Sequence, residues 1–237
     1  MSMRLRRTAR GMRLAEAGAV ISEVLRRPGP THSVFDVLAA AVAALGHGPR
    51  VALLGFAAGG MLGPLRALGY AGPLVGVDLC CSGWPVFRRL CGRWAGRVRL
   101  EHAEAGSWLR GRRERFDVIV EDLSVVGPAG VTKPAVSLGE LPPLAARRLA
   151  RGGVVVVNLL PVPGMRFAQI EAAVGRAHRE VRVVHLAEFE NRILIGGGDD
   201  LAPARGVSRA LGAALRSIGS RTARGLAVRS IMSPSKE

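Results

Sequence analysis

Short apolar runs recur through the middle of the chain, and each is followed by a turn or by a segment with helical spacing. Runs of this kind are typical of strands that are buried on both faces of a parallel sheet. The strands expected on this basis are Val51–Leu54, Leu74–Val77, Phe116–Val120, Val154–Leu160, Val181–Ala187 and Arg192–Ile195. A further strand is expected over Val98–His102, where apolar and polar residues alternate.

Apolar residues with a period near 3.6 predict helices between most of these strands. The expected helices run from a Ser33 cap to Leu45 and over Met61–Leu68, Trp84–Trp94, Leu141–Leu149 and Phe167–His178. Alternating strands and helices imply a doubly wound, mostly parallel sheet of seven strands. The connection over residues 188–191 is too short for a crossover helix, so the last two strands should form an antiparallel hairpin. We therefore expect a Rossmann-like α/β fold that ends in a hairpin.

Both ends of the chain lack this alternation and are rich in arginine. Residues 1–30 end in the linker-like stretch Arg26–Pro30, and we expect them to form a disordered basic lead-in. Residues 199–237 contain a weak amphipathic pattern at Leu211, Leu215 and Ile218, so we expect a basic tail that is partly helical or disordered. The Rossmann-like domain should then span residues 31–198.

The overall composition permits one sizeable core, because 49% of the 237 residues are hydrophobic. The formal net charge of +16 suits an anionic partner such as nucleic acid. Arginine is abundant along the whole chain, however, and only 4% of the residues are aromatic, so stacking platforms for single strands are scarce. Nucleic acid therefore stays open as a partner.

Other sequence features concern location and metals. No apolar run approaches the length of a membrane span, and the basic start lacks the apolar core of a signal peptide. The cysteines, Cys80, Cys81 and Cys91, fit neither a disulfide framework nor a zinc site. We expect a cytoplasmic protein without a metal.

A glycine turn directly follows the first expected strand. Gly55, Gly59 and Gly60 allow the chain to turn sharply and to approach a ligand closely. The amino end of the helix that begins at Met61 faces the same place, which suits a nucleotide. The turn half-matches the dinucleotide-binding pattern and lacks the Gly-Lys-Ser/Thr of a P-loop. The alternative is a purely structural turn.

Acidic residues follow the ends of the next three strands. Asp78 is placed to accept hydrogen bonds from a ribose diol, with capping of the next helix as the alternative. Glu104 could accept an adenine amine or cap a short helix, and Asp122 could act as a general base or orient a nucleophilic amine. Glu121 should point to the other face and be solvated or paired with an arginine. Because the carboxyl ends of parallel strands share one edge, Gly55, Asp78, Glu104 and Asp122 should line one crevice.

These motifs together resemble the spermidine synthase-like branch of the class I S-adenosylmethionine-dependent methyltransferase fold over roughly residues 30–198. The likeness is carried by the turn Gly55–Gly60, by Asp78 at the ribose position and by the pair Glu104–Ala105 on the adenine side. The stretch Phe116–Asp122 resembles the strand that leads to the family's catalytic aspartate. Further matches are the glycine-proline-alanine stretch Gly127–Ala129 and the asparagine-led last strand Glu190–Ile195.

The resemblance implies binding of S-adenosylmethionine or its decarboxylated form, and transfer of an aminopropyl or methyl group to a nucleophile. It makes Asp122 the catalytic residue and implies a small-molecule acceptor such as an amine, and a homodimer. The implied cofactor contacts come from Gly55, Phe56, Ala57, Gly59, Asp78, Leu79, Glu104, Ala105 and Asp122. The chain departs from polyamine synthases at Leu123–Val126, where a second aspartate is usual. It also leaves no room before residue 30 for the N-terminal β-domain of that family.

Two other functions stay open. One is a methyltransferase that acts on another substrate, RNA among them. The other is a catalytically inactive fold member that acts as a binding protein, which the alanines Ala57 and Ala58 in the glycine motif would fit. A nicotinamide-dependent oxidoreductase is disfavoured by the closing hairpin and by the strand that leads to Asp122.

Overall fold

The computed structural model describes residues 3–16, 18–127 and 130–232. Its main sheet has eight strands in the order β13-β11-β12-β10-β7-β4-β5-β6. The strands from β10 to β6 are parallel, and β12, β11 and β13 are antiparallel to their neighbours. Their bounds are β4 Val51–Leu54, β5 Leu74–Asp78, β6 Val98–His102, β7 Phe116–Glu121, β10 Leu149–Leu159, β11 Glu180–Leu186, β12 Arg192–Gly197 and β13 Leu226–Met232.

The doubly wound, mostly parallel sheet with an antiparallel β11–β12 hairpin is confirmed. The observed strands lie close to the expected ones, except that β10 begins at Leu149 rather than at Val154. The apolar runs of β4, β7 and β10 are buried between two layers of helices, whereas β6 lies at the edge of the sheet and is only partly buried. The main sheet has one strand more than expected, because β13 of the basic tail adds to its edge.

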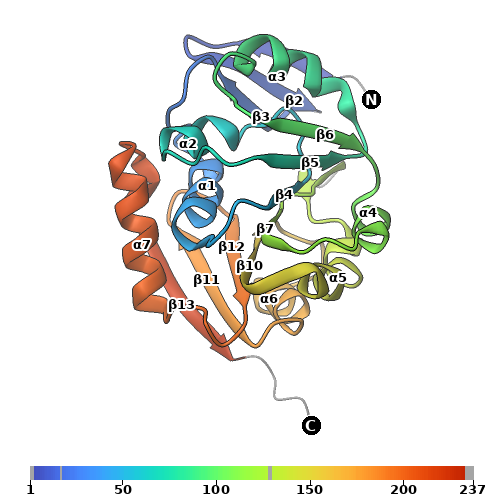
Figure 1. Cartoon of the computed structure of the whole chain (residues 1–237), viewed down its shortest axis with the longest axis vertical. Coiled ribbons are helices and arrows are strands. Elements are labelled where there is room, and N and C mark those ends of the chain that lie inside the picture. The colour runs from blue at the N-terminus through green and yellow to red at the C-terminus, as the bar shows by residue number, and fades with distance from the viewer. Residues whose placement is uncertain (1–2, 17, 128–129, 233–237) are drawn as a thin grey trace.

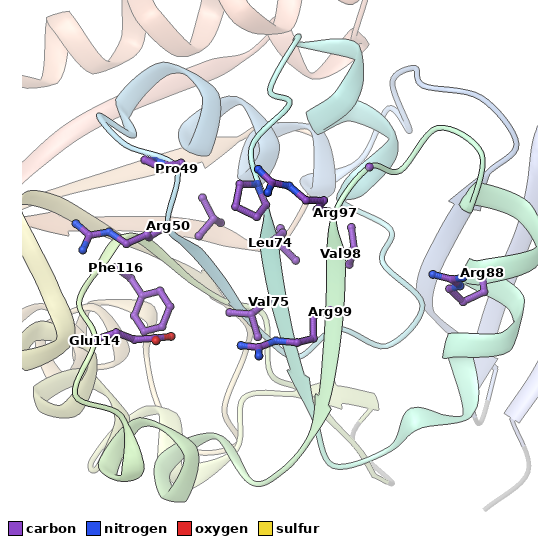
Figure 2. Close-up of a pocket in the computed structure, with 13 residues that line it drawn as sticks. Pro49, Arg50, Leu74, Val75, Arg88, Arg97, Val98, Arg99, Glu114 and Phe116 are labelled. Atoms are coloured by element: carbon purple, nitrogen blue, oxygen red, sulfur yellow. The ribbon is translucent and has the colours of Figure 1, made fainter.

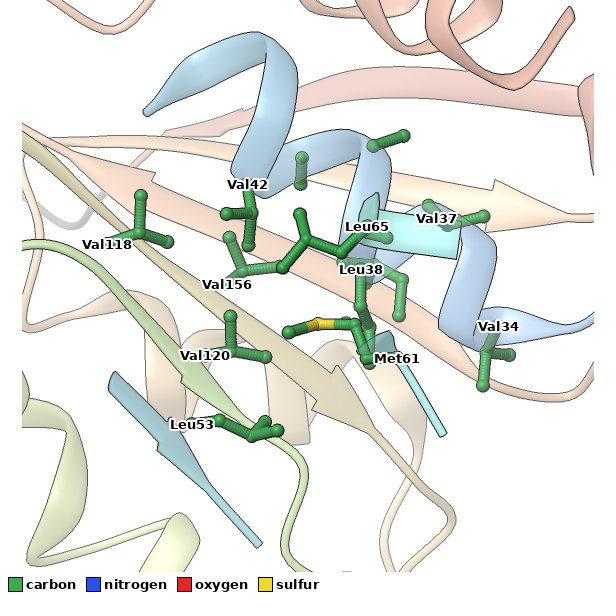
Figure 3. Close-up of a cluster of buried hydrophobic side chains, with 14 of the residues drawn as sticks. Val34, Val37, Leu38, Val42, Leu53, Met61, Leu65, Val118, Val120 and Val156 are labelled. Carbon is green, nitrogen blue, oxygen red and sulfur yellow. The ribbon is translucent and has the colours of Figure 1, made fainter. Parts of the chain in front are cut away.

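Helices cover both faces of the sheet (Figure 1). One face carries α1 Val34–Leu45, α2 Leu62–Ala67, α3 Trp84–Cys91 and α7 Ala204–Ser217, and the other carries α4 Ala105–Gly111, α5 Leu141–Arg148 and α6 Phe167–Gly175. Short 3-10 turns occupy η1 Cys81–Gly83, η2 Ala135–Ser137 and η3 Arg221–Ala223. Figure 3 shows the core beneath α1, where Leu38 and Val42 lie against Val120 and Val156 of the sheet. Ser33 caps α1, as expected, by accepting a hydrogen bond from the Phe35 amide.

The expected disordered lead-in is instead a small antiparallel sheet of β1 Met3–Arg7, β2 Gly11–Glu16 and β3 Ala19–Leu25. The prediction that residues 1–30 form a disordered lead-in is therefore wrong for the described residues of this segment. Met12 and Leu14 are buried and alternate with an exposed Arg13, so the period of two is present but is hidden among arginines. The indole of Trp94 donates to the Arg26 carbonyl at 2.9 Å and ties this sheet to the segment after α3.

The expected loose tail also folds, as α7, η3 and β13. Val207, Leu211 and Leu215 are fully buried at helical spacing in the core that α1 also enters. β13 pairs with β11 from Glu180 opposite Met232 to Leu186 opposite Leu226. The arginines of α7 lie on its outer face, so composition alone disguised an ordinary amphipathic helix.

Within the described ranges, none of the helices combines the length and the apolar character needed to cross a lipid bilayer.

Candidate functional site

The glycine turn after β4 and the chain after β7 meet at the carboxyl edge of the sheet. The Gly55 amide donates to the Val77 carbonyl at 2.9 Å, and the Asp122 amide donates to the Leu54 carbonyl at 2.8 Å. Gly55 has φ +87°, and a Cβ on it would lie 2.5 Å from the Asp122 carbonyl oxygen. Glycine is therefore required here, because the two loops approach each other too closely for a side chain.

Asp78 holds the glycine turn in shape. One carboxylate oxygen accepts a hydrogen bond from the Ala57 amide at 2.6 Å, and the other accepts one from the Cys80 amide at 2.8 Å. Ala57 has φ +47°, a left-handed conformation that costs alanine about 1 kcal/mol and is maintained here by that short hydrogen bond. Each carboxylate oxygen of Asp78 still has a free lone pair, and the residue is partly exposed, so it can accept further donors such as hydroxyls.

Glu104 adopts the capping role that was one of its two expected alternatives. Its carboxylate accepts the Gly106 and Ser107 amides at 2.7 and 2.6 Å at the start of α4. Burial opposes its ionisation, but these amide hydrogen bonds outweigh burial, so the pKa of Glu104 is lowered. The neighbouring Ala105 is buried in the core of that face.

Two other expected cofactor contacts lie at the same edge but differ in exposure. The Phe56 side chain is buried and packs edge-on against Trp84 and Phe87, so only its backbone is available to a ligand. Leu79 is 68% exposed just beyond Asp78, and its carbonyl lies 2.8 Å from the ring nitrogen Nε2 of His102.

Asp122 is the last of three polar side chains that are linked by hydrogen bonds, and each of the three lies at the end of a different strand. Asn158 donates from Nδ2 to the Asp122 carboxylate at 2.7 Å, and Asn191 donates to the Asn158 carbonyl oxygen at 2.9 Å. Burial raises the pKa of Asp122 to about 6, against the opposing effects of the Asn158 hydrogen bond and the Lys133 charge. The negative charges of Glu121 and Asp78 also raise that pKa, so Asp78 and Asp122 lie close enough to sense each other across the edge.

Glu121 differs from the expectation that it is solvated or paired with arginine. It is buried and pairs with Lys133, whose Nζ lies 2.8 Å from its carboxylate, and the exposed fractions of the two side chains are 4% and 0%. Lys133 also donates to the Leu123 carbonyl at 3.1 Å, and the Leu123 amide donates back to Glu121 at 2.8 Å. The pair closes the segment between Asp122 and Lys133, which carries the short strands β8 Val125–Gly127 and β9 Gly130–Thr132. The wrong part of the prediction concerns its surroundings, because Glu121 lies among buried residues such as Leu141 and Val157 on the α5 side of the sheet and its partner is a lysine.

The basic tail reaches this edge of the sheet as well. Asp36, at the start of α1, is fully buried and accepts hydrogen bonds from Thr31 and from Ser220, which lies just before η3. His32 has φ +60°, and its Nδ1 accepts a hydrogen bond from the Arg221 amide at 3.4 Å. Burial and the charges of Arg221 and Arg10 lower the pKa of His32.

Sequence reasoning missed two of the residues that surround Asp122, Asn158 and Lys133, and it gave Asn191 no role beyond its place in the last strand. Each carries a signal in the sequence. Asn158 is the one polar residue within the apolar run Val154–Leu160, and Lys133 is one of only two lysines in a chain with 34 basic residues. A polar residue inside a buried strand needs a partner, and that partner is found only when the strands are assembled.

Within the described residues, no group of three or more histidine, cysteine, aspartate or glutamate side chains could hold a metal ion. Of the cysteines, Cys91 is buried and Cys80 is exposed beside Asp78.

Comparisons with known proteins reveal the fold but no family. No protein-family model matches the chain, and no curated protein sequence matches it significantly. Among solved structures, human methyltransferase-like protein 13 in complex with SAH is similar with a TM-score of 0.61 and 16% identity, over 79% of this chain and 91% of that one. Spermidine synthase from Thermotoga maritima is similar with a TM-score of 0.58 and 15% identity, over 82% of this chain and 68% of that one.

A third similar structure is the T. thermophilus 16S rRNA N2 G1207 methyltransferase in complex with AdoMet and guanosine. Its TM-score is 0.51 and its identity is 18%, over 82% of this chain and half of that one. This chain therefore has the fold that S-adenosylmethionine-dependent methyltransferases share with spermidine synthase.

Proposed function

We propose that this chain is a spermidine synthase-like transferase that binds S-adenosylmethionine or its decarboxylated form and transfers an alkyl group to a nucleophile. The observation that carries the proposal is the convergence of Asp78 and Asp122 on either side of the turn at Gly55. Similar structures with this fold were solved with SAH, with AdoMet and with the transition-state analogue AdoDATO.

The residues of the edge fit such a co-substrate. The free lone pairs of Asp78 suit a ribose diol, and residues 57–60 of the neighbouring turn carry no side chain larger than a methyl group. Two carboxylates close together give this space a negative potential, which complements a sulfonium cation. The co-substrate supplies an electrophilic carbon bonded to that sulfonium.

Asp122 is the residue to which we assign acid–base chemistry. A nucleophile on the acceptor attacks the carbon, the carbon–sulfur bond breaks with its electrons going to sulfur, and the acceptor proton passes to Asp122. A carboxylate with a pKa of about 6 is still ionised at neutral pH and is a stronger base than an ordinary aspartate. Asn158 and Asn191 act as positioning residues, because their hydrogen bonds fix the orientation of that carboxylate.

The acceptor side favours a nucleophile without two cationic ends. Glu121 is neutralised by Lys133, so Asp122 is the carboxylate at this strand end that lacks a cationic partner within the described residues. A diamine would need a second acid, and the residues after Asp122 are Leu123, Ser124 and Val125. The co-substrate residues thus resemble those of spermidine synthase, but the second acid for a diamine is missing. An experiment must therefore decide between aminopropyl and methyl transfer.

Calorimetric titration separates these possibilities. We would titrate the chain with S-adenosylmethionine, decarboxylated S-adenosylmethionine, methylthioadenosine and NAD, and repeat the titrations with Asp78→Ala. Tighter binding of the decarboxylated form would indicate aminopropyl transfer, and preference for S-adenosylmethionine would indicate methyl transfer to a small molecule or to RNA. Asp199→Ala is the matched control, because Asp199 is an exposed aspartate paired with Arg179 far from this edge. Absence of binding by all four compounds would refute the transferase proposal and support a binding protein.

A further inference from the structure

A second cavity lies at the opposite edge of the sheet, where the parallel strands begin. It has a volume of about 500 Å³ and is lined by the first residues of β4, β5, β6 and β7 with the residues that precede them. The five residues of β5 separate the two edges by about 16 Å at 3.3 Å per residue, so this cavity is distinct from the site around Asp122.

The floor of the cavity is apolar. It is formed by Val51, Leu74, Val75 and Phe116, all of which belong to strands of the main sheet, and by Val98 at the sheet edge. Pro49 and Pro73 also line the cavity and bring no amide donors to it, because proline has no backbone N–H. A floor of this kind favours an apolar group over a small hydrated ion.

Guanidinium groups surround that floor. Figure 2 shows Arg50, Arg97 and Arg99 around Leu74 and Val75, with Arg88 farther out to one side. Glu114 is the one acidic residue in the lining, so the lining carries four positive charges and one negative charge. Arg50 pairs with Asp117 and Arg99 pairs with Glu101, whereas the Arg97 side chain has no hydrogen-bond or ion-pair partner among the described residues.

The walls of the cavity are held in place before any ligand arrives. The Arg66 guanidinium donates to the carbonyls of Tyr70, Gly72 and Ala95 at 2.5 to 3.0 Å, which joins the loops before β5 and before β6. The Tyr70 hydroxyl donates to the Pro49 carbonyl at 2.9 Å and adds the start of β4 to the same assembly. A preformed cavity of a few hundred cubic ångströms is the usual form of a small-molecule site.

We infer that this arginine-rimmed cavity binds a small amphipathic organic anion, with its apolar body on the Val75–Phe116 floor and its carboxylate, sulfonate or phosphate against Arg97 and Arg99. An anion of this class complements both the arginine side chains and the apolar floor of the cavity. The unpaired Arg97 gains a charged partner, and the apolar floor is removed from water.

The test is calorimetric titration of the full chain with dodecanoate. We expect saturable binding of one dodecanoate per chain, which weakens with added salt because the guanidinium groups are exposed. Dodecyltrimethylammonium has the same apolar chain with a cationic head and should not bind. Equal binding of the two amphiphiles would overturn the inference, since the arginine rim would then contribute nothing.

Two double variants separate this cavity from the general positive charge of the protein. Arg97→Ala with Arg99→Ala should weaken dodecanoate binding by about tenfold, which corresponds to two exposed charge contacts. Arg205→Ala with Arg209→Ala removes the same charge from the exposed face of α7 and should leave the affinity unchanged. Equal weakening by both variants, or no saturable binding, would refute the cavity as a site. Exposed side chains are changed in both cases, so the melting temperature should stay near that of the wild type.

Discussion

Replacement of Asp122 by asparagine should stabilise the protein, and the gain should depend on pH. The pKa of Asp122 in the folded chain is about 6, against 3.8 as its ordinary value. At 1.36 kcal/mol per pKa unit, this difference amounts to about 3 kcal/mol of unfolding free energy. Such a gain would identify Asp122 as a group that is kept for chemistry at the expense of stability.

The sign follows from the direction of the shift. Because the pKa of Asp122 is raised on folding, its favourable contribution is complete below pH 3.8 and is lost as the pH rises through about 6. Asparagine does not titrate and keeps the hydrogen bond that Asn158 donates at 2.7 Å. The gain of Asp122→Asn over the wild type should therefore grow from under about 1 kcal/mol at pH 4 to about 3 kcal/mol at pH 7.

Urea unfolding at pH 4, 5.5 and 7 measures this gain. Asp199→Asn serves as the control, because both side chains of the Arg179–Asp199 pair are more than 70% exposed and the change should alter stability by less than about 0.5 kcal/mol. A gain of the same size at every pH, or a loss of stability at pH 7, would refute the conclusion that the ionised Asp122 carboxylate lowers the unfolding free energy of the wild type.

Three further predictions concern the groups around the site and the folded tail. Lys133→Met should lower the unfolding free energy, measured by urea unfolding, by about 3–5 kcal/mol, because Glu121 then loses its buried partner at 2.8 Å. The double variant that also carries Glu121→Met should regain most of the lost unfolding free energy. A double variant no more stable than Lys133→Met would contradict this coupling. Asn158→Ala should raise the pKa of Asp122 above about 6 in an NMR titration, and an unchanged titration would contradict the positioning role. Leu211→Ala should cost about 2–5 kcal/mol in the same unfolding assay, whereas Arg209→Ala on the exposed face of α7 should cost under about 0.5; equal effects would mean that α7 does not pack on α1.

The central part of the fold was predictable because its residues follow simple patterns. β4 occupies the residues that its apolar run indicated, β6 occupies those that its alternating pattern indicated, and β11 and β12 form the hairpin that their short connection required. The ends were not predictable by the same route. In β2 and α7 the buried residues are correctly spaced, but arginine fills most of the exposed positions and makes both segments look like solvated tails.

The sequence was sufficient to predict which strand ends form the candidate site. Gly55, Asp78 and Asp122 were identified because each follows a buried strand, and the carboxyl ends of parallel strands share one edge. The partners of these residues depend on contacts between segments far apart in the chain. Asn158 reaches Asp122 across 36 residues, and Ser220 reaches Asp36 across 184 residues.

The sequence by itself determined the order of strands and helices, the antiparallel end of the sheet and the edge at which acidic residues gather, because these features depend on local periodicity and connection length. The tertiary structure decided that both basic ends fold onto the core, that Lys133 neutralises Glu121, and that Asp122 is partly buried with a pKa of about 6. Burial and charge pairing are properties of the assembled neighbourhood, and no local pattern in the chain specifies them.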